Sequence, residues 1–381
     1  MNLADTALLL ALFATVTTAW WAVPALTRAR YVFGVAVPPD RAADPALTAI
    51  RDRYGRNVIV LGIGLAALTF LAGRFTDPVA ALGTGATVLV AADLAVYALA
   101  GRAVRAAKAD GDWYAGTRQG VIADLTFRTD PVRVPWTGLA PALAVVAATV
   151  AIGLLRAGSL PDSLPGMDGA TMDGGPRVPT GFWTAANPVL AQVALTAATW
   201  LVLVAIVRSR PDIDAARPAA TARRYRAYLQ ALVHLGLVTA VCANLTLAGI
   251  ALRLWEILPA TVLTTVAVFT PLVVAAVFAV RFELRVGTGG HRLPAAPDEE
   301  DEDTGLVQRD DDRHWHLGGL VYANGDDPAV LVHQRVGGSQ WTLNLGHPVG
   351  RTTGILLAAA ILAAVVLGAA GVIDLPETRR L

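Results

Sequence analysis

The chain has 381 residues, of which 55% are hydrophobic and only 16% are charged, whereas about a quarter of the residues of a typical soluble domain are charged. This deficit favours lipid as the solvent of much of the chain, and the net charge of +1 excludes a global field that would attract nucleic acid. The single cysteine, Cys242, excludes a disulfide within the chain and a cysteine-based metal site.

Eight segments of the sequence are apolar enough, over about 20 residues each, to cross an ~30 Å hydrocarbon layer as helices. The first lacks the basic start of a signal peptide and carries Asp5, so we interpret it as a spanning helix. The predicted spans are 4–26, 57–73, 79–101, 137–155, 188–207, 228–251, 260–280 and 353–373.

The connections between these spans alternate in their content of Arg and Lys. The basic connections carry six such residues in 27–56, six in 102–136, six in 208–227 and seven in 281–352, whereas each of the others carries one or two. Because short loops rich in Arg and Lys stay in the cytoplasm, the alternation predicts a multi-pass protein of the cell membrane with both its N- and C-termini outside. Adding or removing one span would break the alternation.

Two of the basic connections contain expected helical extensions. Asp44-Pro45 is typical of an N-cap followed by the first residue of a helix, and apolar residues follow at helical spacing, which predicts an amphipathic helix over 45–56 that runs into the second span. Residues 212–227 should extend the sixth span as a basic segment. We interpret such stretches as anchors at anionic lipid headgroups, with a specific partner site as the alternative.

The long connection 281–352 divides into two parts of different composition. Residues 287–312 are rich in Gly, Pro and acidic residues, which predicts a disordered linker. Residues 313–350 contain three β-prone runs, separated by Asn324-Gly325 and by Gly337-Gly338, which predict a small antiparallel β module on the cytoplasmic side. The runs are 315–323, 329–335 and 339–345.

The fold class is therefore an all-α polytopic membrane protein of about eight helices, with the β module between its last two helices. A seven-helix membrane domain covers 1–286, and the eighth helix and tail cover 351–381. Because a sheet of about three strands is marginal alone, the module should pack against membrane helices or other loops. Its histidines favour polar positions on a solvated sheet face over a metal site, since no cysteine or further ligand spacing accompanies them. These are His314, His316 and His333, with His347 just beyond.

Two ionisable residues lie inside predicted spans, where such groups are costly and often functional. Asp93 and His234 are both about 10–12 Å from the cytoplasmic end of their spans, at 1.5 Å per residue. One hypothesis is that they share a polar interior as a proton- or ligand-responsive pair. The alternative, which we favour, is that backbone, Thr hydroxyls or water satisfy each one separately.

Other features of the spans indicate helix packing rather than chemistry. Gln192 and Asn244 should form hydrogen bonds between helices, and Ala360, Ala364 and Gly368 form a small-residue stripe that predicts close packing within the chain or in a homodimer. The motifs of zinc proteases, serine hydrolases and P-loop proteins are absent, so we expect no enzyme and no cofactor.

Three stretches of the sequence resemble the SdpI-like family of bacterial membrane proteins, in particular the relatives that carry an additional C-terminal β module. The first is 31–38 with 50–54, and the second is the outer loop with its two Leu-Pro pairs at 160–161 and 164–165. The third and most specific lies in the β module and comprises Trp315, Gly318, Tyr322, Asn324, Asp326-Asp327-Pro328 and Trp341-Thr342-Leu343-Asn344. This sequence departs from the family pattern after the second Leu-Pro, where relatives have a His and this chain has Gly166-Met167-Asp168-Gly169.

The resemblance implies a non-enzymatic sensor or toxin-immunity and signalling protein of the bacterial cell membrane. Its partners would be a cytoplasmic regulator protein or an extracellular peptide, with the outer loop 156–187 as the sensor. The competing hypothesis is a secondary transporter with a polar site near Asp93 and His234, and a membrane enzyme is the weakest of the three.

Overall fold

The structure is a computed structural model that describes residues 3–28, 30–165, 177–294, 296–297, 302–337 and 339–369. Its contacts divide the chain into two units. The first consists of Met1–Asp124, Ser209–Ala222 and Gly287–Leu381, and the second of Leu125–Arg208 and Arg223–Val286.

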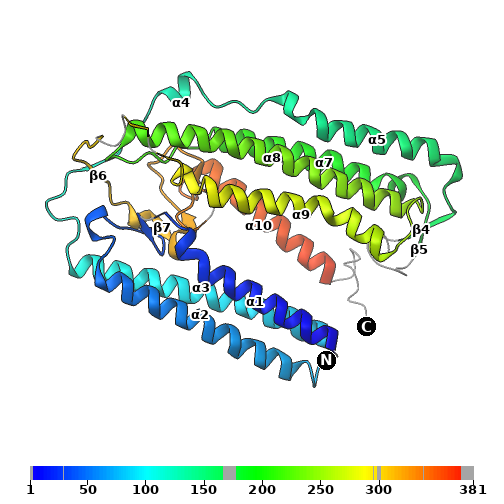
Figure 1. The fold of residues 1–381 in the computed structure, drawn as a ribbon, viewed down its shortest axis with the longest axis horizontal. Coiled ribbons are helices and arrows are strands. Elements are labelled where there is room, and N and C mark those ends of the chain that lie inside the picture. Colours follow the sequence, from blue (N-terminus) through cyan, green and yellow to red (C-terminus); the bar gives the residue numbers. More distant parts are fainter. Residues whose placement is uncertain are drawn as a thin grey trace. The chain divides into compact units, whose positions relative to one another are not determined.

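The first unit is built on α1 (Leu3–Leu26), α2 (Pro45–Ala72) and α3 (Pro78–Asp110), which lie side by side in Figure 1. Helices α2 and α3 begin in the same way. The carboxylates of Asp44 and Asp77 accept hydrogen bonds from backbone N–H groups of the first turn, and a proline follows each of them. These N-caps confirm the helix predicted over 45–56, which is continuous with the second span. The last helix of this unit is α10 (Pro348–Ala369).

The second unit contains the short helix α4 (Thr126–Thr129) and the long helices α5 (Ala140–Arg156), α7 (Phe182–Val207) and α9 (Val262–Arg285). It also contains most of α8 (Pro218–Leu254), whose first residues belong to the first unit. A hairpin of β4 (Ser163–Pro165) and β5 (Arg177–Pro179) lies beyond α5. Its Leu164 is fully buried in a cluster with Leu254 and Trp255 at the end of α8.

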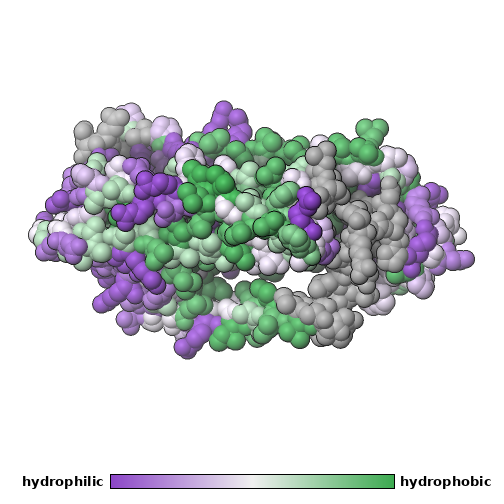
Figure 2. Space-filling view, turned by 90° about the horizontal axis from the view of Figure 1, so that it is seen from below, coloured by the Kyte–Doolittle hydropathy of each residue, from purple (hydrophilic) through white to green (hydrophobic). Residues whose placement is uncertain are grey.

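Within the described residues, seven helices are long and apolar enough to cross a membrane, and they coincide with the first seven predicted spans. The eighth predicted span falls on α10, whose apolar portion Pro348–Ala363 is shorter, while 370–373 lie outside the described residues. Large apolar side chains are exposed along the helices, including Ile63 at 68% and Val273 at 62%. Figure 2 shows hydrophobic residues along the middle of the helices and hydrophilic residues toward the ends. A helix surface of this kind is suited to lipid.

The β module follows α9 and precedes α10, as predicted, but it is not one sheet of three strands. It has two antiparallel hairpins, one of β7 (Trp315–His316) with β8 (Val321–Tyr322) and one of β9 (Leu331–His333) with β10 (Trp341–Leu343). One bridge between Tyr322 and Asn344 connects them. The predicted strand 315–323 is interrupted because Leu317, Gly318 and Gly319 all have positive φ, which folds the run back on itself.

Two further pairings hold segments around the module in the first unit. The hairpin of β1 (Tyr31–Val32) and β2 (Val35–Ala36) turns at Phe33 and Gly34, both of positive φ. In the acidic segment, β6 (Val307–Gln308) pairs in parallel with β3 (Gln119–Gly120). The carboxylate of Glu302 accepts hydrogen bonds from the N–H groups of Ala219 and Ala220 at 2.8 and 2.9 Å, where α8 begins. The composition of 287–312 did not predict these contacts.

Candidate functional site

The motif residues of the β module meet around Asn344, whose side chain is fully buried. Its Nδ2 donates to the backbone carbonyls of Asn324, Asp327 and Ala329 at 2.9–3.1 Å. Its Oδ1 accepts from the N–H groups of Asn324 and Gly346 at 2.9 and 3.0 Å. One amide side chain therefore closes the loop 324–329 onto the end of β10, which only a residue with both donors and an acceptor can do.

A second part of the motif connects the module to the segment before α8. The hydroxyl of Tyr322 donates to the carboxylate of Asp327 at 2.9 Å and accepts from Nδ2 of Asn324 at 3.1 Å. Asp327 also forms an ion pair with Arg210. The indole of Trp341 donates to the Ser209 hydroxyl at 3.1 Å. The motif thus attaches the module to residues 209–210, more than a hundred positions away in the sequence.

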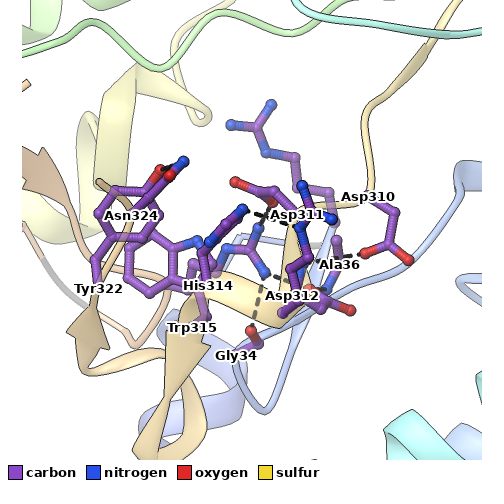
Figure 3. A network of polar contacts seen from close by, with 12 residues as sticks. Gly34, Ala36, Asp310, Asp311, Asp312, His314, Trp315, Tyr322 and Asn324 are labelled. Atoms are coloured by element: carbon purple, nitrogen blue, oxygen red, sulfur yellow. Dashed lines mark hydrogen bonds and ion pairs between the residues drawn. The ribbon is translucent and has the colours of Figure 1, made fainter. Parts of the chain in front are cut away.

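Arg335 is the central cation of the junction between the module and the rest of the first unit. It is 3% exposed and forms ion pairs with Asp311 and Asp312, and its Nη1 donates to the carbonyl of Gly34 at 3.3 Å. Figure 3 shows these acceptors gathered around one guanidinium. The same guanidinium stacks on the ring of Trp315 at 4.8 Å. Residues from the acidic segment, the β1–β2 hairpin and the module therefore share one buried charge.

Asp312 also joins this cluster to α3. Its carboxylate lies 2.5 Å from Nζ of Lys108, near the end of α3, and accepts from the N–H of Ala36 at 3.0 Å. Burial alone would raise the pKa of Asp312, but the charges of Arg335 and Lys108 outweigh it and hold the pKa below its ordinary value. Asp312 is therefore ionised as the shared counter-ion of two buried cations.

A second buried ion cluster surrounds Asp212. This carboxylate forms ion pairs with Arg28 and Arg30, in the segment that connects α1 to β1. Burial would raise its pKa, but Arg30 and Arg28 hold it well below the ordinary value. His333 lies nearby and is 5% exposed. Burial, followed by the charge of Arg28, lowers the pKa of His333 to about 3, so this histidine is neutral. The prediction of a solvated position is wrong for His333.

Gly318 places the module directly against α3. Its φ is +67°, and a Cβ atom at this position would lie 2.7 Å from Cδ1 of Tyr97. A Cβ atom at Gly34 would lie closer still to the backbone of Gly318, and a Cβ atom at Gly101 would lie 2.8 Å from the carbonyl oxygen of Phe33. The rings of Phe33 and Tyr97 are in edge contact at 5.4 Å. Glycines at these positions allow backbone segments to meet without side chains between them.

Asp93 lies one helical turn from Tyr97 on α3. It is fully buried, and neither of its carboxylate oxygens has a hydrogen-bond partner among the described residues. A groove of about 440 Å³ between α1 and α2 is lined by apolar residues and by Thr6, Thr17 and Thr18, but Asp93 does not line it. The carboxyl group is therefore buried among the helices and is not part of this groove.

His234 belongs to the second unit and has a different environment. Its side chain is exposed, and Nδ1 lies 2.7 Å from the carbonyl oxygen of Gln230 on the preceding turn of α8. A partner from its own helix is what the favoured alternative predicts for His234. The hypothesis that Asp93 and His234 act as a pair stays a prediction.

A polar cluster lies midway along the helices of the second unit. Gln192 of α7 donates to the hydroxyl of Thr149 at 3.2 Å and to the backbone carbonyl of Asn244 at 2.9 Å. Asn244 of α8 donates to the hydroxyl of Thr196 at 2.9 Å and to the carbonyl of Ala240 at 2.8 Å. These contacts confirm that Gln192 and Asn244 form hydrogen bonds between helices. Because a backbone carbonyl only accepts, they also establish which end of each amide is the donor.

The sequence prediction found the module motif but missed the charged residues at its junction. Arg335, Asp312, Lys108 and Asp212 were each counted with the basic connections or the acidic linker. Arg335 lies between the motif residues 326–328 and 341–344, and this position could have drawn attention to it. Its partners, Asp311, Asp312 and Gly34, lie outside those motif residues. Among the described residues no group of three or more His, Cys, Asp and Glu could hold a metal ion. The family departure at 166–169 lies outside the described residues.

Among the described residues, seven helices are long and apolar enough to cross a membrane, which indicates a multi-pass helical membrane protein. Comparison of the chain with protein-family models, with curated proteins and with solved structures finds no match.

Proposed function

We propose that this protein is a non-enzymatic sensor of the bacterial cell membrane, of the toxin-immunity and signalling type that its sequence resembles. In this proposal α10 is the eighth span, the alternation of basic loops places the β module in the cytoplasm, and both termini are outside. The outer loop 156–187 receives the signal, and the cytoplasmic face carries it to a regulator protein.

The observation that carries the proposal is the ion cluster of Arg335, Asp312 and Lys108. The module's own apolar cluster is small, consisting of Trp315, Tyr322 and Val332 with Ala329 against it. A domain with so little core depends on its contacts with the helices for stability. The contacts that join it to the rest of the first unit include buried ion pairs, in which the loss of one partner leaves an uncompensated buried charge. Such a junction is suited to reporting a change in the helices.

The proposal is tested by deleting the gene and complementing it with variants. Deletion should increase the sensitivity of the cells to a membrane-active peptide toxin and change the expression of neighbouring genes, and the wild-type gene should restore both. Arg335→Met should fail to restore them while still reaching the membrane. Arg41→Met, at an exposed ion pair with Asp40, is the matched control and should restore both. Unchanged sensitivity and unchanged expression in the deletion strain would count decisively against the proposal.

A secondary transporter remains the second candidate because Asp93 is a buried carboxyl group within an apolar helix. Its test is solute uptake by vesicles containing the purified protein under a proton gradient. Uptake that Asp93→Asn abolishes would favour the transporter over the sensor. Cross-linking in the same vesicles would show whether the small-residue stripe of α10 forms a homodimer.

A further inference from the structure

Asp93 occupies the face of α3 that packs against α1 and α2. Residues four positions apart lie on the same face of a helix, and Leu89 and Tyr97, which flank Asp93 at this spacing, are both fully buried. Leu89 belongs to an apolar cluster with Phe13 of α1. The ring of Tyr97 lies 6.1 Å from that of Trp20, also of α1. Asp93 is therefore enclosed between an apolar layer and an aromatic layer.

No counter-charge is available to Asp93 from the stretches of α1, α2 and α3 that surround it. The segments 8–26, 57–72 and 78–101 contain no other Asp, Glu, Lys, Arg or His. The titratable groups that flank it are phenols: the fully buried Tyr97 on its own helix, and Tyr54 of α2, whose hydroxyl donates to the carbonyl of Trp20 at 2.7 Å. A carboxylate enclosed in this way would be a bare negative charge, which proteins avoid by keeping the acid neutral.

We propose that Asp93 is a proton-binding site. In the enclosed arrangement its carboxyl group carries the proton and is neutral, and it releases the proton to water only when the three helices separate enough to admit water. The ligand of the site is thus the proton itself, and its occupancy distinguishes a closed from an opened helix bundle.

The position of Tyr97 connects this site to the β module. Its ring is in contact with Phe33 of the β1–β2 hairpin and lies directly beneath Gly318, so movement of α3 at Asp93 displaces the backbone of the module. Proton release at Asp93 should therefore loosen the Gly318 turn. This link between Asp93 and the Gly318 turn rests on the proposed sensor function, whereas the proton site itself does not.

The proton site is tested by infrared spectroscopy of the purified full-length protein in lipid vesicles. At neutral pH the wild-type spectrum should contain the C=O stretch of a protonated carboxyl group that the Asp93→Asn spectrum lacks. Asp77→Asn is the matched control, because Asp77 lies on the same helix but is exposed and accepts a hydrogen bond as the N-cap of α3. This control should retain the band. Labelling of Asp93 by an apolar carbodiimide, which reacts with protonated carboxyl groups, should decline as the pH rises.

Two outcomes would overturn the proposal. One is an Asp93→Asn spectrum that retains every protonated carboxyl band of the wild type. The other is a carboxylate band at Asp93 that shifts when sodium replaces choline in the buffer, because a metal cation would then occupy the site. Neither readout depends on a toxin, a regulator or a transported solute, so failure of the sensor proposal would leave this test unaffected.

The connection to the module is tested by amide hydrogen exchange over 315–323. As the pH is raised, amide exchange over this segment should become faster in the wild type than in Asp93→Asn. At acidic pH the exchange rates of the two proteins should agree. Equal exchange in both proteins at every pH would show that Asp93 does not act on the module.

Discussion

The ring of Tyr97 and the backbone of Gly318 are in direct contact, so that a Cβ atom added at 318 would lie 2.7 Å from Cδ1 of the ring. Gly318 also has a φ of +67°, a conformation that residues with a side chain rarely adopt. The contact is therefore intolerant of substitution for two separate reasons, one at the backbone and one at the aromatic neighbour.

Gly318→Ala should loosen the junction of the module with α3. Overpacking of a buried contact costs about 1–3 kcal/mol, to which the strain of a positive φ adds. The measurement is limited proteolysis and hydrogen exchange over 313–347. Gly305→Ala controls for backbone strain alone, since Gly305 has a φ of +66° but open space around it, and Gly325→Ala controls for the added methyl group. Gly318→Ala should increase proteolysis and hydrogen exchange more than either control. An increase no larger than that of Gly305→Ala would exclude a steric clash with Tyr97 as a cause.

Hydropathy and loop charge predicted most of the helices because each signal lies within one segment. The N-caps at Asp44 and Asp77 are equally local, as are the turn residues of the module. The prediction of one three-stranded sheet failed at 317–319, where glycines are compatible with a strand or with a tight turn. The structure has a turn there, and it packs against Tyr97. Burial of Asp93 was predictable from its place in an apolar run.

The ion clusters could not be predicted in this way. Lys108 and Asp312 are separated by 204 positions, and Arg28 and Asp212 by 184. Which cation meets which carboxylate depends on how the chain folds, and the sequence contains many exposed residues of the same kinds. The composition of 287–312 pointed to a solvated linker because acidic residues usually remain in water. In the structure, Asp310, Asp311 and Asp312 instead form ion pairs with the buried cations Lys108 and Arg335.

Arg335→Met should destabilise the module strongly because it leaves the carboxylates of Asp311 and Asp312 without their shared cation. Removal of one partner of a buried ion pair typically costs about 3–5 kcal/mol. The measurement is the loss of protease resistance of 302–337 in detergent. Combining Arg335→Met with Asp312→Asn should recover part of the loss, since the double variant leaves less uncompensated charge. A double variant that is less stable than the sum of the single variants would contradict this explanation.

His333 should make the module less stable at mildly acidic pH. Its pKa is lowered from 6.5 to about 3 in the folded protein, so below pH 6.5 the unfolded chain binds a proton that the folded chain does not. Stability should therefore fall as the pH drops from 6.5 toward 3. The pKa of Asp212 is also lowered, but this residue affects stability in a different pH range. Its stabilising contribution is present above pH 3.8, the ordinary pKa of an aspartate, and is lost only below that pH. Of these two groups, only His333 changes the stability between pH 6.5 and about 4.

The measurement is the unfolding of the module as a function of pH, followed by hydrogen exchange over 329–345. His333→Gln should flatten the slope in this interval, because glutamine binds no proton in either state. His316→Gln, at an exposed position of the first hairpin, is the control and should keep the wild-type slope. Equal slopes in wild type and His333→Gln would show that His333 is not buried in its neutral form.

The contact between Asn244 and Thr196 should couple α7 and α8 in the second unit by only about 0.5–1 kcal/mol, as is usual for hydrogen bonds between membrane helices. Asn244→Leu removes a donor, but Thr196 still donates to the carbonyl of Gln192, so few buried groups lose their last partner. The coupling is measured by a double-mutant cycle of Asn244→Leu and Thr196→Val, with unfolding in denaturing detergent as the readout. Thr239→Val is the control, because among the described residues its hydroxyl bonds to the carbonyl of Leu235 on its own helix, and it should show no coupling with Asn244→Leu. A coupling of several kcal/mol would mean that the cluster holds α7 and α8 together far more strongly than its hydrogen bonds account for.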